Sequence, residues 1–306
     1  MKTILIYIFI ILFFNSCQYT NEPIVEIGLF DVSKDDSRIL FSLYDKRGGA
    51  IYEININGTQ FKEVIGATQD SSFFNPKYSN DGKKMVFIGS ANSNPAYHDI
   101  YIADSDGTHR KKLTRNQKNI SEAVLSKCSN EIYFIQSAEF GKGSPLGRNQ
   151  LHGTDVYSLK IDDGSIKKIT DLYSYGIFRV SEIDCDHLLM DVADAPKGEM
   201  IIISKSNPKH LVSINPVNDP RKNISFYVSP LYSEKYDMLA FEAPYEIYIM
   251  PLKTKIAKLI AKSNDQISSV NFFNKKKSVV YTKENNNGFY IVDFEGNNLG
   301  KIEIPL

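Results

Sequence analysis

The chain has 306 residues, enough to bury a substantial core in one domain, and its 36 Lys and Arg balance its 36 Asp and Glu. The resulting formal net charge of zero argues against nucleic acid or a broad acidic surface as partner, because such binding needs a positive field. The 18 Tyr and 18 Phe supply aromatic mass suited to strands, and no long linker or like-charge block divides the sequence. We therefore expect one folded domain.

The N-terminus differs in kind from the rest of the chain. Lys2 precedes an almost wholly apolar run from Ile4 to Phe14, which is too short to span a bilayer and is typical of a secretory signal peptide. Cys17 stands where bacterial lipoproteins carry their acylated cysteine. We predict that residues 1–16 are removed, that Cys17 is lipidated and that residues 17–23 form a tether. Ordinary secretion, with Cys17 incidental or removed, and a short membrane anchor are the alternatives.

The clearest structural unit covers residues 73–115. Residues 76–87 read as a strand, a tight Asn-Asp-Gly turn and a second strand. After a loop, residues 99–103 predict a third strand, and a turn with Gly107 leads to a short strand that ends at Thr114. The unit therefore contains four predicted strands.

This pattern recurs along the chain. A serine stands eight residues before a phenylalanine four times, and a tyrosine and a turn glycine recur downstream. The pairs are Ser33 and Phe41, Ser79 and Phe87, Ser126 and Phe134, and Ser233 and Phe241. Met190 and Tyr281 fill the phenylalanine position in two weaker units.

Six such second strands predict an all-β fold, a six-bladed β-propeller of four-stranded antiparallel blades, because a sandwich has no reason to keep a fixed Ser-to-Phe spacing. The propeller is expected over residues 24–306. Its blades are predicted at about 27–67, 73–115, 120–171, 177–213, 224–262 and 267–306. Residues 302–304 are expected to complete the last blade without a shared strand; alternatively, residues 23–27 add to that blade.

The repeat resembles that of TolB-type propellers. The resemblance rests on Pro-x-Tyr-Ser-x-Asp-Gly-Lys-Lys, Asp-Ile-Tyr-Ile-Ala-Asp-x-Asp-Gly and Lys-Lys-Leu-Thr within residues 76–114. Related repeats build the propellers that precede prolyl-oligopeptidase-type hydrolase domains and those of some polysaccharide lyases. The match is close for residues 73–115, fair for 27–67 and 120–171, and weak for 177–213. It implies the fold and does not specify a function.

The loops between second and third strands vary widely in length, whereas the turns between first and second strands are tight. Since scaffolds place recognition on variable loops, we predict binding at the end of the ring that carries these loops. The most elaborate loop runs from Ser137 to His152. The predicted ligand-binding residues on this face are Phe140, Lys142, Arg148, His98 and His152. A solvated insertion without a role is the alternative.

Enzyme signatures are missing from the sequence: it has no Gly-x-Ser-x-Gly elbow, dinucleotide fingerprint or His-Glu-x-x-His. His98 and His152 precede third strands of adjacent blades, but a metal needs at least three convergent ligands. We therefore predict no catalytic residue, no metal and no cofactor. A carbohydrate-active propeller lyase or hydrolase is the alternative, and it would bring both histidines together with Asp191 and Asp194.

Several other residues are expected to have structural roles. The carboxylates at the starts of third strands, Asp99, Asp155 and Glu246, are expected to accept hydrogen bonds or to pair with a neighbouring blade, and the repeated serines to bond turn backbone. Cys128 and Cys185 fall on equivalent turns of neighbouring blades. We expect two partly buried free thiols, with a disulfide as the alternative in an exported chain.

The sequence thus favours a non-catalytic binding or scaffold propeller. We expect a monomeric lipoprotein of the bacterial cell envelope, anchored at the outer membrane or the periplasmic face. Its partner would be a protein, peptide or glycan, and nucleic acid is not expected.

Overall fold

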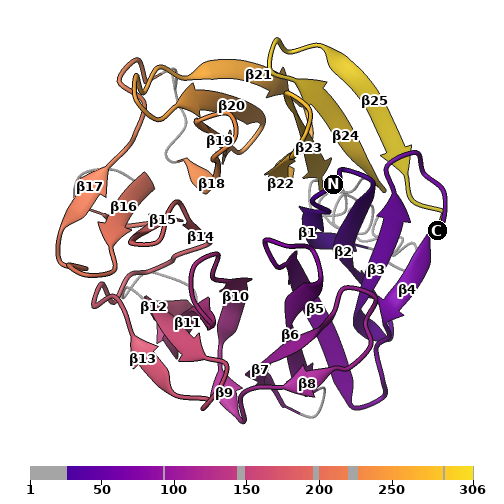
Figure 1. Cartoon of the computed structure of the whole chain (residues 1–306), viewed down its shortest axis with the longest axis vertical. Coiled ribbons are helices and arrows are strands. Elements are labelled where there is room, and N and C mark those ends of the chain that lie inside the picture. The colour runs from indigo at the N-terminus through magenta and orange to yellow at the C-terminus, as the bar shows by residue number, and fades with distance from the viewer. Residues whose placement is uncertain are drawn as a thin grey trace, which may run out of the picture.

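A computed structural model describes residues 26–91, 94–142, 149–195, 200–219, 227–284 and 287–305. These residues form six antiparallel sheets, arranged as blades in a ring (Figure 1). In each blade the first strand lies toward the centre and the fourth lies outermost. The predicted all-β six-bladed propeller is confirmed. The predicted signal peptide, Cys17 and the tether lie outside the described residues.

The strands follow one another in chain order within each sheet. The first three blades consist of β1 (Glu26–Val32), β2 (Arg38–Asp45), β3 (Gly48–Asn55) and β4 (Lys62–Ile65); β5 (Ser71–Tyr78), β6 (Lys84–Ala91), β7 (Asn94–Asp104) and β8 (Lys111–Lys112); and β10 (Ile120–Leu125), β11 (Glu131–Lys142), β12 (Asn149–Lys160) and β13 (Ile166–Lys168). A short extra strand, β9 (Gln117–Lys118), also pairs with β7, so the second sheet has five strands where four were predicted.

The remaining three blades each have four strands. They consist of β14 (Val180–Glu182), β15 (His187–Asp191), β16 (Met200–Ser204) and β17 (Leu211–Ser213); β18 (Val228–Ser233), β19 (Met238–Ala243), β20 (Glu246–Pro251) and β21 (Lys258–Lys262); and β22 (Ile267–Phe272), β23 (Ser278–Lys283), β24 (Gly288–Asp293) and β25 (Asn298–Glu303).

The two ends of the ring differ. The loops between second and third strands and the links between blades lie at one end, here the loop face. The turns between first and second strands and between third and fourth strands lie at the other end, here the turn face. The described part of the chain contains no helix with the length and apolar character needed to cross a membrane.

The recurring aromatic residues are cross-strand partners within their blades. Phe87 on β6 is opposite Tyr101 on β7, and their rings stack with centroids 5.4 Å apart. The same pairing joins Phe41 with Tyr52, Phe134 with Tyr157, Phe241 with Tyr248 and Tyr281 with Tyr290. In the fourth blade Met190 is opposite Ile201, so this blade lacks the aromatic pair by which the others are recognised.

The hydrophobic core is divided into six clusters, and each cluster fills one interface between neighbouring blades. Both faces of a blade are therefore buried, which explains why the second strands read as almost continuous apolar runs. Leu40 and Phe41, adjacent on β2, illustrate this arrangement. Leu40 packs in the cluster shared with the second blade, whereas Phe41 packs in the cluster shared with the sixth.

Three of the four repeated serines accept backbone N–H groups in the turns between first and second strands, as predicted; they are Ser33, Ser79 and Ser126. The Ser79 hydroxyl donates to Asp81 Oδ1 at 2.6 Å and accepts the backbone N–H of Lys84 at 2.9 Å. Gly82 in this turn has φ +74°, a conformation that glycine adopts without strain. Ser33 makes the equivalent bond to the N–H of Arg38.

The ring closes through side chains. Among the described residues no strand is shared between the chain ends: β1 pairs with β2, and β25 completes the sixth sheet beside β24. Asp36 accepts the backbone N–H groups of Asn274 at 2.6 Å and Lys275 at 2.7 Å. Phe289 packs edge-on against Phe30, with centroids 5.2 Å apart. This arrangement confirms that the C-terminal strand completes the last blade without a shared strand.

Cys128 and Cys185 form a disulfide, with Cα atoms 5.5 Å apart. The prediction of two partly buried free thiols is therefore wrong, and both residues are exposed. Their placement on equivalent turns of the third and fourth blades is confirmed. Glu182 explains why the turns meet, because its Oε2 accepts the backbone N–H of Lys127 at 2.5 Å and holds the two blades together beside the cysteines.

Candidate functional site

The longest hairpin of the propeller projects from the loop face of the third blade. Strands β11 and β12 have twelve residues each, whereas the adjacent first strand β10 has six. Their pairing continues to Lys142 opposite Asn149, so residues 137–142 and 149–152, which were expected to belong to a loop, are paired strand. Near this end Phe140 is opposite Leu151, and the Phe140 side chain is 67% exposed. The chain therefore holds an aromatic ring in solvent on a regular, paired element.

The link between the third and fourth blades carries three more exposed aromatic residues, of which Tyr173 contacts this hairpin. Tyr173, Tyr175 and Phe178 are 52%, 50% and 54% exposed. The link is tied to the hairpin, because Ser174 and Thr154 exchange backbone hydrogen bonds of 2.9 and 3.1 Å. We call Phe140, Leu151, Tyr173, Tyr175 and Phe178 the aromatic patch.

Tyr173 is held in place by its neighbours. A Cβ atom on Gly153 would lie 2.7 Å from the Tyr173 ring, so the glycine allows the ring to approach the hairpin. The Tyr173 hydroxyl donates to Glu139 Oε1 at 2.5 Å. Tyr173 also has φ +48°, which a bulky residue seldom adopts. The patch is therefore partly fixed before any partner binds.

The structure places the predicted site residues in different surroundings. Phe140 and Lys142 are exposed on β11, as a binding site requires. His152 on β12 is part-buried and lies against the Tyr173 ring, with centroids 6.3 Å apart. His98 on β7 has other partners, since its Nδ1 is 2.6 Å from the carbonyl oxygen of Ile120. Arg148 lies outside the described residues.

The carboxylates at the starts of third strands hold their blades together. Asp155 is 1% exposed; its Oδ1 accepts the Thr170 hydroxyl at 2.7 Å and the backbone N–H of Leu172 at 2.6 Å. Lys168 lies 3.0 Å from its other oxygen. Asp99 has the equivalent arrangement with the fourth strand of its own blade. The expected structural role is confirmed, and most of the partners belong to the same blade.

Inside the ring, the side chain of Arg179 crosses between blades. It is 1% exposed, and its guanidinium donates to Glu122 Oε1 at 3.3 Å and to Ser269 Oγ at 2.6 Å. Arg179 precedes β14, Glu122 lies on β10 and Ser269 on β22, so one side chain joins the fourth, third and sixth blades. Pockets of about 330 Å³ and about 500 Å³ open at the loop face and the turn face, respectively.

Two further carboxylates are buried near Arg179. Asp191 accepts three backbone N–H groups, those of Phe178, Arg179 and Ser229, yet burial raises its pKa to about 6. Burial likewise raises the pKa of Glu242 to about 7, although the charge of Arg179 opposes this rise. The bond from the Ser229 N–H of the neighbouring blade explains the position of Asp191 without reference to a substrate, whereas Glu242 Oε1 is buried without a hydrogen-bond partner.

The residues required by the carbohydrate-active alternative have separate partners. His98 contacts the backbone of β10, His152 faces Tyr173, Asp191 bonds the backbone near β14 and β18, and Asp194 accepts the Ser174 hydroxyl. In the described residues, no group of three or more His, Cys, Asp or Glu side chains is arranged to hold a metal ion.

Sequence reasoning missed Tyr173, Tyr175 and Phe178. Tyr173 and Tyr175 stand between two predicted blades, and Phe178 stands at the start of the fourth predicted blade, where the repeat is weak. Three aromatic residues within six positions were the only sequence feature that indicated an exposed aromatic surface there. The pocket at the turn face was also missed, because its residues come from tight turns that resemble one another.

No family model matches the sequence, and no curated protein matches it. The fold is similar to that of TolB from Acinetobacter baumannii, with TM-score 0.67 and 18% identity, covering 87% of this chain and 63% of that one. The chain thus spans less than two thirds of that TolB. A structure titled as a nidogen/laminin complex gives TM-score 0.64 and 9% identity, covering 91% and 93%.

An oligogalacturonate lyase in complex with manganese gives TM-score 0.59 and 12% identity, covering 90% of this chain and 77% of the lyase. At these identities the similarities describe the fold. The chain has the fold of a TolB-like six-bladed β-propeller.

Proposed function

We propose that this propeller is a non-catalytic binding protein of the bacterial cell envelope, which holds a partner on its loop face. The aromatic patch is the observation that carries the proposal. Of the three partner classes expected from the sequence, a protein fits the patch best. Tyrosine and other large aromatic side chains supply much of the binding energy at protein interfaces.

The physical argument concerns exposed apolar area. A monomeric protein seldom gathers several large apolar side chains on one surface without a binding role. Here four aromatic rings and a leucine lie on two segments joined by backbone hydrogen bonds. Covering them would remove apolar area from water, and the paired backbone limits the entropy lost on binding.

The envelope location rests on the N-terminal sequence. Residues 1–16 would direct export, and Cys17 would carry the lipid that anchors the mature monomer, with residues 17–23 as tether. Multiple acyl chains hold a protein firmly at a membrane, whereas a single chain binds only marginally. The TolB similarity is compatible with this location.

The binding proposal is tested by a pull-down from solubilised envelopes with the mature chain as bait. Replacing Phe140 and Tyr175 with serine should reduce the captured partner at least about tenfold, since truncating each interface anchor costs about 1–2 kcal/mol. The matched control replaces Ile256 and Leu299 with serine. These residues are 56% and 55% exposed and lie outside the patch. Equal capture by the two double variants would refute the proposed site.

Two further outcomes concern the partner and the anchor. The envelope extract is also treated with protease or with glycan-digesting enzymes before the pull-down. If capture survives the protease but is lost after glycan digestion, the partner is a glycan and not a protein. For the anchor, the Cys17→Ser variant should leave the membrane fraction. Full retention of that variant with membranes would contradict lipidation at Cys17.

A further inference from the structure

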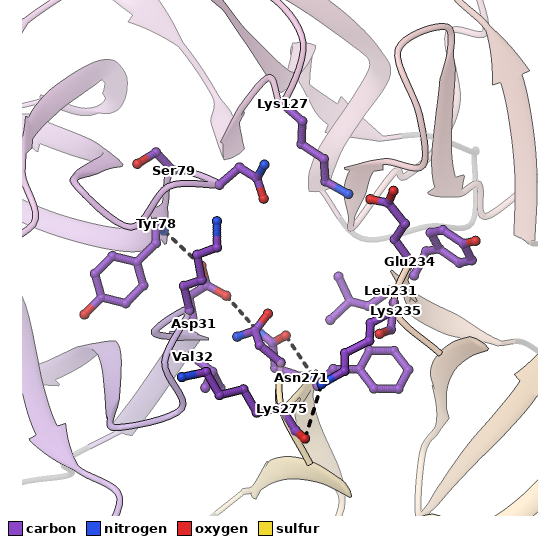
Figure 2. A pocket seen from close by; sticks show the side chains of 16 residues that line it. Asp31, Val32, Tyr78, Ser79, Lys127, Leu231, Glu234, Lys235, Asn271 and Lys275 are labelled. Atoms are coloured by element: carbon purple, nitrogen blue, oxygen red, sulfur yellow. Dashed lines mark hydrogen bonds between the residues drawn. The ribbon is translucent and has the colours of Figure 1, made fainter. Parts of the chain in front are cut away.

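A pocket in the turn face, here called the mouth, concentrates positive charge. The pocket of about 500 Å³ is lined by Lys34, Lys127, Lys235 and Lys275, which come from the first, third, fifth and sixth blades. Figure 2 shows Lys127 extending over the mouth from the side opposite Lys275. Only Asp31 and Glu234 contribute carboxylates to the lining, so the mouth has a formal net charge of +2 in a chain whose total is zero.

These lysine side chains are not neutralised by ion pairs. Within the described residues, no carboxylate forms a salt bridge with any of the four ammonium groups. The Lys235 ammonium donates to the carbonyl oxygen of Lys275 at 3.3 Å, which satisfies one donor and leaves its charge in place. Asp31, by contrast, is engaged, because its oxygens accept the Tyr78 N–H and the Asn271 amide at 2.9 Å each (Figure 2).

The backbone beneath two of these lysines is fixed by neighbouring blades. Glu182 accepts the Lys127 N–H at 2.5 Å, and Asp36 accepts the Lys275 N–H at 2.7 Å. The disulfide of Cys128 adds a covalent tie beside Lys127. The main chain is therefore preorganised, while the ammonium groups have no carboxylate partner. Such an arrangement suits a ligand that brings its own negative charge.

The remaining lining indicates which kind of anion fits. Val32, Leu231 and Phe272 provide apolar surface, and the exposed Asn80 provides an amide for hydrogen bonding. The charges are distributed over four blades, so a single small anion cannot contact them all. An extended chain with several carboxylates can, and its backbone and methylene groups can use the polar and apolar surface between the lysines.

We propose that the mouth is a second binding site, which takes an acidic peptide segment. The site lies on the opposite end of the ring from the aromatic patch, so the two can be occupied independently. Long-range attraction by the lysines would speed encounter, and added salt would weaken binding.

The test measures binding of fluorescein-labelled tetraglutamate to the mature chain by anisotropy. We expect saturable binding that weakens as salt rises, and at least a tenfold loss in the double variant Lys127→Gln, Lys275→Gln. The matched control is Lys46→Gln, Lys253→Gln, which removes the same charge from exposed lysines outside the pocket. This control and the Phe140→Ser, Tyr175→Ser variant should bind within about twofold of the unmodified chain.

Three outcomes would overturn the proposal. Absence of saturable binding, or equal loss in both lysine variants, would show that no specific site exists at the mouth. Inorganic tripolyphosphate, used as a competitor, should bind more weakly, because it cannot use the apolar lining. If tripolyphosphate binds as tightly as the peptide and with the same dependence on the lysines, the ligand of this site is a small polyanion and not a peptide. If the Phe140→Ser, Tyr175→Ser variant loses partner capture but still binds the peptide, the result bears on the aromatic patch and not on the mouth.

Discussion

The disulfide between Cys128 and Cys185 gives the most direct test of the structure. The perturbation is the double substitution Cys128→Ser, Cys185→Ser, made in a Cys17→Ser background so that no other thiol is present in the three-cysteine chain. Both positions are exposed, so serine should fit without disturbing the core. The two turns should stay together in the folded variant, because Glu182 still accepts the Lys127 N–H.

The magnitude follows from the length of chain that the bond closes. The cysteines are 57 residues apart. In the chain-entropy model a closed loop of this length lowers the entropy of the unfolded chain by about 14 cal/mol/K, which is about 4 kcal/mol at 25 °C. With an unfolding entropy of about 2 cal/mol/K per residue, this loss corresponds to a decrease in Tm of about 7 °C.

The assay is thermal and urea unfolding of both proteins, with and without reducing agent. The parent protein should be less stable when reduced, whereas the double variant should unfold identically in both conditions. Equal midpoints of the two proteins under non-reducing conditions, or two titratable thiols in the folded parent protein, would refute the reasoning. A loss well above 4 kcal/mol would instead show that the bond also determines how the third and fourth blades pack.

Three more predictions concern other residues of the ring. Asp36→Ala should cost about 2–4 kcal/mol by urea unfolding, because two backbone N–H groups of the sixth blade lose a charged acceptor, and Asp36→Asn should cost less. The folded-state pKa of Glu242, about 7, exceeds its ordinary value of 4.5, so its contribution to stability falls as pH rises between these values. Glu242→Gln should therefore be more stable than the parent at pH 8, by up to about 3 kcal/mol, and gain nothing at pH 4; a pH-independent difference would contradict the assignment. Asp155→Ala should cost about 3–5 kcal/mol, since the Thr170 hydroxyl and the Leu172 N–H lose their acceptor, and unchanged unfolding would show that these bonds contribute little.

The repeat was readable in the sequence because each blade has the same internal register. Phe87 and Tyr101 must be opposite each other on adjacent strands, and this requirement fixes their spacing in every blade that uses the pair. The serine and glycine of the turns are fixed by local backbone geometry in the same way. The fourth blade was hard to see because Met190 and Ile201 make an equivalent contact without an aromatic signature.

The contacts between blades could not be predicted from the repeat. Arg179 meets Ser269 across ninety positions of sequence, and nothing near either residue indicates the other. The disulfide was judged wrongly for a related reason. The repeat placed the cysteines on equivalent turns, but the blade-to-blade distance that lets their sulfur atoms meet depends on how Glu182 packs against the neighbouring turn.

The sequence by itself determined the fold class and the number of blades, since these follow from local register. It also marked the long segment with Phe140, but as a loop, whereas the structure forms a paired hairpin there. Only the tertiary structure decided which surfaces gather residues of one kind. The aromatic patch combines β11 and β12 with the link between the third and fourth blades, and the mouth combines turns from five blades, four of which contribute a lysine. Closing the ring brings together residues that are equivalent in the repeat but distant in the chain. The local sequence pattern fixes the register within a blade and contains no information on which blades then meet.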